Sequence, residues 1–130
     1  MNEIVIYLGQ QYSSIYKEVR EQRFKIACDV TAKLMKLGFV VFSPILNSHP
    51  LDDAGLVPFG WTFWQKQDLP MLKRCDVLLV LKTDGWEQSK GLKGEIECAN
   101  LHNIPQLYVR PCSINENLVN TIQELMWGVV

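Results

Sequence analysis

Four short apolar segments, separated by longer segments with helical character, constrain the fold of this chain more than any other feature. The apolar segments span residues 3–9, 39–43, 76–82 and 105–109. The first of them, EIVIYLG, is apolar enough to be buried on both faces, as strands of a parallel sheet are. Strands that alternate with helices indicate an α/β fold in which helices cover both faces of a parallel sheet. We therefore expect residues 1–130 to form a single three-layer domain of the flavodoxin- or Rossmann-like class.

The segments between the strands carry the signals of helices. Apolar residues recur at helical spacing through residues 16–37, and Gly38 follows where a helix end favours glycine. Further helices are expected over residues 61–74, 90–103 and 114–126. Pro70 is expected to start a new turn or to kink its helix. Residues 44–60 hold three prolines and two glycines, which predicts a long loop.

Composition narrows the possible classes of function. The chain has a net charge of −1, so it has no broad basic surface with which to neutralise the phosphates of a nucleic acid. Its longest apolar run, Val77 to Leu81, is far too short to cross a bilayer. The N-terminus lacks the basic segment and cleavage site of a signal peptide. We therefore expect a cytoplasmic protein with no nucleic-acid or membrane partner.

Residues that usually bind metals are sparse and widely spaced. Cys28, Cys75, Cys98 and Cys112 form no C-x-x-C pair, and the chain has only 2 histidines. Neither a zinc nor an iron–sulfur pattern is present. We expect free thiols and no metal or other cofactor.

Three loops that follow strands are expected to form the functional site. They span residues 9–14, 43–60 and 83–91. In parallel sheets, ligands bind beyond the carboxyl ends of the strands, near the switch in strand order. The unusual residues of the chain concentrate in these loops.

The third loop leads into a helix that carries Glu95 in its first turns. On a helical projection Glu95 falls at the edge of the apolar stripe, whereas Glu97 falls on the solvent side. A carboxylate at the edge of a buried stripe is costly unless it is satisfied, and the N–H groups and dipole of a helix N-terminus can satisfy it. Its position leaves two interpretations open, a structural cap and a functional carboxylate.

Several neighbouring residues also have both a structural and a functional interpretation. Ser89, Gly91 and Gly94 match no established phosphate loop, yet they stand at a helix N-terminus, which binds anions through its N–H groups. Gly9 indicates that something passes close to the backbone after the first strand, although an ordinary polar turn fits equally well.

Four side chains near the same edge complete the set of candidates. Tyr7 either packs in the core or faces the site, and Asp68 is placed to point into it. Trp86 is one of four aromatic residues close to these loops, with Trp61, Phe63 and Trp64; most of them are expected to pack in the core, although one could stack on a base. His49, in the sequence NSHP, is more often a hydrogen-bonded loop residue than a catalyst.

Taken together, these residues resemble the nucleoside 2-deoxyribosyltransferase superfamily, which includes deoxynucleoside-monophosphate N-glycosidases and small uncharacterised phage and bacterial domains. The similarity covers about residues 3–110. The strand ending in YLG looks like the tyrosine-containing first strand of that family. The family also has an acidic helix residue followed by an Ala/Cys–Asp pair that opens a strand, and this pattern resembles the stretch WTFWQKQDLPMLKRCDVLLVL. Its Ser-x-Gly-x-x-x-Glu signature resembles SKGLKGE.

The resemblance implies a role for each matching residue. Glu95 would be the nucleophile, Tyr7 would orient its carboxylate or contact the sugar, and Asp68 would assist departure of the base. Ser89 would bind the 5′ end of the substrate. Also assigned to substrate binding are Gly9, Gly91, Trp86 and His49. The implied reaction is cleavage or transfer at the N-glycosidic bond of a nucleoside or its 5′-monophosphate.

Two other functions and an assembly state follow from the same features. A non-catalytic nucleotide-binding or sensing module would keep the glycine loop without needing Glu95. A receiver domain needs an acidic cluster where this chain has Gly9, Gln10 and Gln11, and therefore fits poorly.

The resemblance implies a homodimer or a larger homo-oligomer. The apolar residues of segment 114–126 also offer more apolar surface than one small sheet needs.

Overall fold

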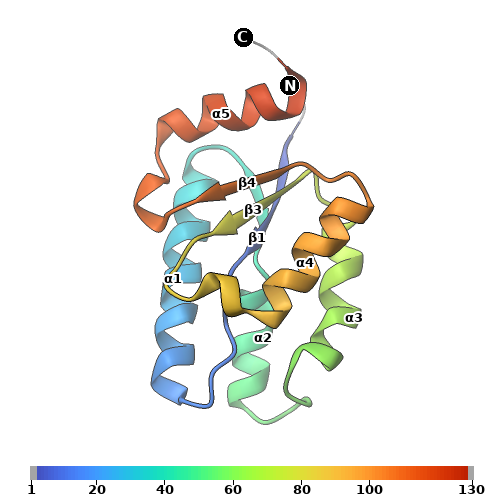
Figure 1. Ribbon diagram of the computed structural model, residues 1–130. Helices are drawn as coiled ribbons and strands as arrows, with labels where there is room; N and C mark the ends of the chain where they lie inside the picture. Colours follow the sequence, from blue (N-terminus) through green and yellow to red (C-terminus); the bar gives the residue numbers. More distant parts are fainter. Residues whose placement is uncertain (1–2, 129–130) are drawn as a thin grey trace.

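A four-stranded parallel sheet forms the centre of the molecule (Figure 1). The computed structural model describes residues 3–128, so residues 1–2 and 129–130 of the expected domain lie outside the described part. The strands are β1 (Val5–Gly9), β2 (Val40–Phe42), β3 (Val77–Leu81) and β4 (Gln106–Val109). Their order across the sheet is β2-β1-β3-β4, and every neighbouring pair is parallel. The expected parallel α/β fold is therefore confirmed.

Five α-helices and two short 3₁₀ turns lie between or after the strands within residues 3–128. The helices are α1 (Lys17–Lys36), α2 (Pro44–Asp53), α3 (Trp61–Leu72), α4 (Lys90–Leu101) and α5 (Glu116–Trp127). The 3₁₀ turns are η1 (Trp86–Gln88) and η2 (Pro111–Ser113). None of the described helices has the length and apolar character required to span a bilayer.

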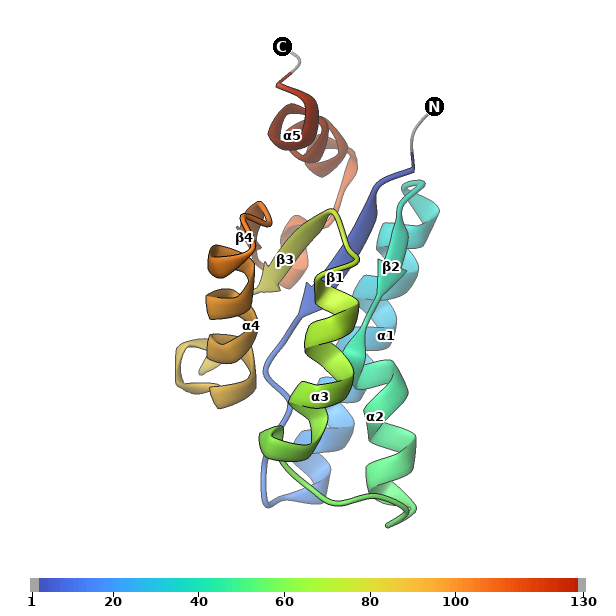
Figure 2. The same ribbon diagram turned by 90° about the vertical axis from the view of Figure 1, so that its right-hand side faces the viewer.

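Helices cover both faces of the sheet (Figures 1 and 2). One face packs on α1 and α5 through a core that includes Leu34 and Ile122. The opposite face packs on α3 and α4 through a second core that includes Leu72 and Leu92. Every residue of β3 is buried, because this strand lies inside the sheet and is covered on both sides.

Helix α2 replaces the first part of the loop that the prolines of residues 44–60 predict. It begins at Pro44, where proline is tolerated because the first N–H groups of a helix have no partner within it. Pro50 lies inside the helix on its exposed side and removes one helical hydrogen bond. The burial of Ile45 and His49 offsets this loss, so packing overrides the local signal.

Helix α3 likewise continues through Pro70, where the sequence predicts a new turn or a kink. Pro70 is exposed, and so is Lys66, whose carbonyl the proline leaves without a helical donor. Water can satisfy that carbonyl at the surface.

Helix α5 packs its apolar face against the sheet. Leu118 and Ile122 are buried there, and Ile114 and Met126 pack against the same core. Leu125 is partly exposed. Most of the apolar surface that we expected to be surplus is therefore used within the chain.

The carboxyl ends of β1, β2 and β3 lie at the lower edge of the sheet in Figure 1. The chain leaves β1 for α1 on one face and leaves β3 for α4 on the other, so the switch in strand order falls between these two strands. Such a switch leaves a crevice between the diverging loops.

Candidate active site

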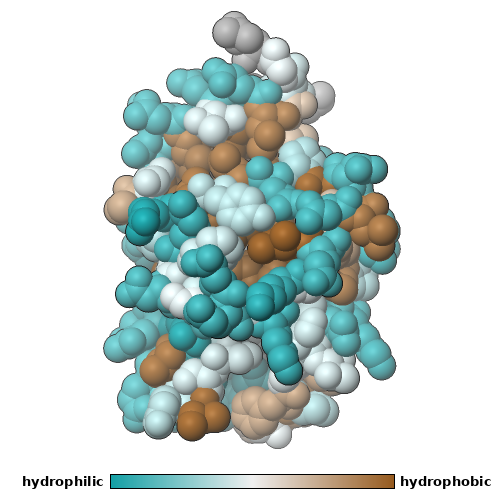
Figure 3. All heavy atoms as spheres, viewed as in Figure 1, coloured by the Kyte–Doolittle hydropathy of each residue, from teal (hydrophilic) through white to brown (hydrophobic). Residues whose placement is uncertain are grey.

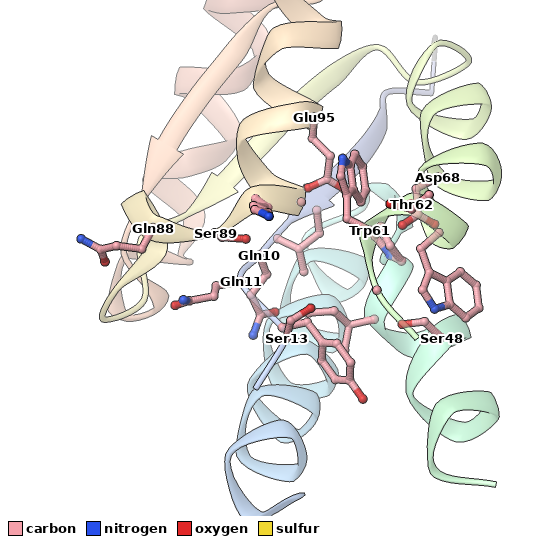
Figure 4. Close-up of a pocket in the computed structure, with 18 residues that line it drawn as sticks. Gln10, Gln11, Ser13, Ser48, Trp61, Thr62, Asp68, Gln88, Ser89 and Glu95 are labelled. Carbon is pink, nitrogen blue, oxygen red and sulfur yellow. The ribbon is translucent and has the colours of Figure 1, made fainter. Parts of the chain in front are cut away.

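A pocket of about 720 Å³ lies at this edge (Figure 4). All three loops that the sequence predicts to meet here contribute to its lining, together with the first turns of α3. Four predicted site residues line it, namely Asp68, Ser89, Gly91 and Glu95. The volume is that of an ordinary small-molecule site. Within residues 3–128, no three His, Cys, Asp or Glu side chains are grouped so that they could hold a metal ion.

Glu95 projects from α4 onto strand β1. Its Oε2 atom accepts a hydrogen bond from the hydroxyl group of Tyr7, which lies 88 positions earlier in the chain. Tyr7 is fully buried and stands opposite Phe42 of β2 and Leu78 of β3. Glu95 is only 4% exposed although it lines the pocket. The structure therefore brings together the two residues that the sequence assigns to the centre of the site.

The N-terminus of α4 is capped by Ser89 and not by Glu95. The Oγ atom of Ser89 accepts a hydrogen bond of 3.2 Å from the backbone N–H of Leu92. Serine is among the preferred residues at this position. The interpretation of Glu95 as a helix cap is therefore wrong. The hydrogen bond that Glu95 accepts from Tyr7 joins α4 to the sheet.

The two buried carboxyl groups of the pocket have raised pKa values. The pKa of Glu95 is raised to about 8, mainly by burial and to a smaller extent by Asp68, while the hydrogen bond from Tyr7 acts in the opposite direction. Burial also raises the pKa of Asp68 to about 7. The pKa of Tyr7 lies well above its ordinary value, because of burial first and then the carboxylates of Glu95 and Asp68. Tyr7 therefore remains a donor while the carboxyl pair exchanges protons near neutral pH.

The indole of Trp61 occupies the groove beside Gly91 and Gly94. A Cβ atom on Gly94 would lie 2.6 Å from Cζ2 of Trp61, and one on Gly91 would lie 3.3 Å from Cε3. Figure 4 shows the indole between the side chains of Glu95 and Asp68. These glycines therefore let α3 approach α4, which is a different reason from the close approach of a phosphate.

Gly9 also permits a close contact within the protein. A Cβ atom there would lie 2.9 Å from Cδ1 of Leu92 and 3.6 Å from Oε1 of Glu95. Something does pass close to this backbone, as expected, and it is the first part of α4. Gly9 is buried and does not line the pocket, so it shapes the site through α4.

His49 lies behind the pocket wall and holds one of the lining residues. Its Nδ1 atom is 2.6 Å from the hydroxyl of Tyr12, and its Nε2 atom is 3.3 Å from Oδ2 of Asp53. The imidazole stacks on Phe24 with 4.4 Å between the ring centroids. Tyr12 lines the pocket, whereas His49 does not. The structure therefore places His49 behind Tyr12, in contact with the site through it.

Trp86 lies away from the pocket lining. It is half-buried in the core between the sheet and α4 and packs against Tyr108, with 5.8 Å between the ring centroids. Of the two interpretations of Trp86, the structure favours packing.

Two lining residues, Gln10 and Tyr12, have no individual role in our sequence analysis, and two others, Trp61 and Trp64, were expected mainly to pack in the core. The indole N–H of Trp64 donates a 3.2 Å hydrogen bond to Oδ1 of Asp52 in α2, an element that we did not expect. Only Trp61 had a local signal, since glycines three positions apart on one helix face indicate a seat for a large side chain.

Comparisons with known proteins agree with the fold and with the family resemblance. A family model described as "Domain of unknown function (DUF1937)" matches residues 4–108. A solved structure of a 2-deoxyribosyltransferase from the psychrotolerant bacterium Bacillus psychrosaccharolyticus is similar, with a TM-score of 0.59 and 27% sequence identity. The match covers 91% of this chain and 80% of that one. The comparison with curated proteins gives no match. The resemblance inferred from the sequence motifs is confirmed.

The contact between Gly94 and Trp61 can be tested by a substitution. Gly94→Ala places a methyl group where the indole lies, and such overpacking costs about 1–3 kcal/mol in the free energy of unfolding. Gly91→Ala is the matched control, because its Cβ atom meets the ring at a longer distance and should cost less. Urea unfolding of both variants measures the difference. Equal costs for the two variants would contradict the proposed seat.

Proposed function

We propose that this chain, which belongs to the DUF1937 family, breaks or transfers the N-glycosidic bond of a nucleoside or a nucleoside 5′-monophosphate. The observation that carries the proposal is the buried Glu95 carboxyl group, bonded to Tyr7 at the wall of a pocket. Similarity to a 2-deoxyribosyltransferase supports glycosyl transfer on nucleosides as the general class.

In this proposal Glu95 is the nucleophile. Breaking the bond between C1′ and the base nitrogen leaves oxocarbenium character on the sugar, which a carboxylate can stabilise or trap as an ester. The bonding electrons depart with the base, and Asp68 supplies the proton that the base needs to leave. Water attacks the ester in hydrolysis, and a second base attacks it in transfer. Tyr7 holds one oxygen of Glu95 and so leaves the other oxygen for C1′.

The N-terminus of α4 is the proposed position of the 5′ group. Ser89, Lys90 and Gly91 line the pocket there, and the first N–H groups of a helix have no partner within it. These N–H groups, the helix dipole and the Lys90 ammonium favour an anion. This arrangement supports a 5′-monophosphate over a nucleoside.

We further propose that the protein self-associates at the open end of the pocket. Ile15, Leu56 and Phe59 are each more than half exposed, in the loops before α1 and before α3. Figure 3 shows apolar residues at the lower end of the molecule, where these loops lie in Figure 1. Ser13 and Gly60 of the same loops line the pocket, so these apolar residues lie in loops that border it. Exposed apolar residues that form a patch indicate an interaction surface.

Light scattering at micromolar concentration tests this assembly. We expect the mass of a dimer or a larger oligomer, and the Leu56→Ser and Phe59→Ser double variant should shift the mass toward the monomer. Leu101→Ser is the control, because this residue is 79% exposed on α4, outside the pocket lining. A wild-type monomer with full activity would exclude a site completed by a second copy.

The role of Glu95 is tested by Glu95→Gln. The amide keeps the shape of the side chain but removes the charge and cannot form the ester. Base release from nucleosides and 5′-monophosphates should fall by about 10³-fold or more. Glu97→Gln is the matched control, since Glu97 is exposed on the same helix and should matter by less than about 1 kcal/mol. Wild-type base release by Glu95→Gln would favour the nucleotide-sensing alternative.

The pH dependence of kcat/KM follows from the two carboxyl groups. Below pH of about 7 both are protonated, and Glu95 lacks the charge that a nucleophile needs. Above pH of about 8 both are ionised, and Asp68 has no proton to donate. Between these values the pair holds one proton, and because the pKa of Glu95 is the higher of the two, the reactive form with Glu95 ionised and Asp68 protonated is the minor arrangement of that proton. Activity should still be highest there, with a bell-shaped profile that belongs to the coupled pair. Asp68→Asn should remove the alkaline limb; an unchanged limb would show that another group donates the proton.

A further inference from the structure

Buried polar atoms without a hydrogen-bond partner gather at the edge of the sheet that carries the pocket. Among the residues from 3 to 128, six buried side-chain atoms lack a partner. Four of them follow the carboxyl ends of strands, namely Oε1 of Gln10 and Gln11 after β1, Oγ of Ser43 after β2 and Oγ1 of Thr83 after β3. Most buried polar groups in folded proteins are paired. Of these four residues Gln10 and Gln11 line the pocket, so their oxygens are the ones that a polar ligand there could complete.

Gln10 is the member of this group that is both buried and part of the pocket lining. Its side chain is 7% exposed. The amide Nε2 atom donates a 2.9 Å hydrogen bond to the backbone carbonyl of Arg23. A carbonyl can only accept, so the orientation of the amide is fixed and Oε1 is the atom left without a partner. Gln10 therefore offers the site one acceptor of known position.

The loop that carries Gln10 is held from two further directions. The guanidinium of Arg23 donates to the carbonyls of Tyr12 and Ser13, at 3.1 and 2.8 Å. The hydroxyl of Tyr12 is bonded to His49 of α2. These hydrogen bonds fix the loop that carries the Gln10 amide, so a ligand has to fit the amide in its present position.

The charges around the pocket exclude a phosphate as the partner of Gln10. Lys90 is the one cationic side chain of the described lining, and it stands at the N-terminus of α4. Asp68 and Glu95 are the other charged residues of that lining. An acceptor such as Oε1 repels phosphate oxygens, which themselves only accept. Its partner must be an N–H or O–H group.

We propose that Gln10 is a specificity-determining residue that accepts a hydrogen bond from a donor on the substrate. This inference rests on the proposed function, because it assumes that a nucleoside or nucleotide fills the pocket. The donor belongs to the exocyclic amino group of a base or to a sugar hydroxyl. A substrate that carries an oxo group or a hydrogen atom in that place leaves Oε1 without a partner.

Matched pairs of 5′-monophosphates test the proposal with the full-length protein. Deoxyadenosine against purine deoxyriboside removes a base amino group alone, and adenosine against deoxyadenosine changes a sugar hydroxyl to hydrogen. Deoxycytidine against deoxyuridine changes a base amino group to an oxo group and also turns the neighbouring ring nitrogen from an acceptor into an N–H donor. Calorimetry gives Kd for each compound, and base release is measured in parallel. The wild type should favour the donor-bearing member of one class of pair by about tenfold, the size of one hydrogen bond.

Two variants of Gln10 separate its acceptor from its bulk. Gln10→Met keeps the length of the side chain and loses the acceptor, so the two members of a pair should then bind with about equal Kd. Gln10→Glu keeps an acceptor oxygen but loses the hydrogen bond from Nε2 to the Arg23 carbonyl, so it should weaken the binding of both members of a pair while retaining the preference. Arg23→Met is the control, because it loosens the same loop while leaving the amide in place, and it should weaken both members of a pair equally. Melting temperatures verify that each variant is folded.

The outcomes separate this inference from the proposed function. A preference that survives in Gln10→Met, or a wild type with no preference in any pair, overturns the role of Gln10. Discrimination in Kd without base release from any compound overturns the catalytic proposal and leaves the role of Gln10 standing. A wild type that binds none of these nucleotides overturns both.

Discussion

Helix α4 lies directly against strand β1 at Gly9, and the arrangement of the site depends on this contact. Without a side chain at Gly9, Leu92 seats in the core, and Glu95, less than one turn later, reaches the hydroxyl of Tyr7. The strand supplies the donor and the helix supplies the acceptor. The geometry of the pair is thereby fixed by packing between two regular elements, which hold side chains more rigidly than loops do.

Burial makes the carboxyl groups of the pocket chemically useful and also costly. An isolated ionised carboxylate in an apolar environment is strongly disfavoured, so Glu95 and Asp68 hold their protons to higher pH than exposed carboxyl groups do. The hydrogen bond from Tyr7 partly offsets this penalty for Glu95. Two carboxyl groups with different surroundings can then take different roles in one reaction, as donor and as nucleophile.

The sequence predicted the sheet well because each strand is a short apolar run bounded by polar loops. The resemblance to a known family, carried by motifs that are weak individually, implied that Tyr7 orients the Glu95 carboxylate or contacts the sugar, and the structure joins the two side chains by a hydrogen bond. Helix α2 was missed because its prolines are a local signal, whereas the burial of Ile45 and His49 depends on the complete fold. Gln10 gave no signal either. Its significance lies in a missing partner, and only three-dimensional structure shows which atoms have partners.

Helix α2 is attached to two walls of the pocket by polar contacts. His49 holds Tyr12 in the loop after β1, and Asp52 accepts the indole N–H of Trp64 in α3. Both partners line the pocket, whereas Tyr7 and Glu95 belong to the sheet and to α4. Helix α2 therefore fixes two lining residues that lie outside the Tyr7–Glu95 pair. A change in this one ten-residue helix can move two walls of the pocket while the hydrogen bond between Tyr7 and Glu95 stays in place.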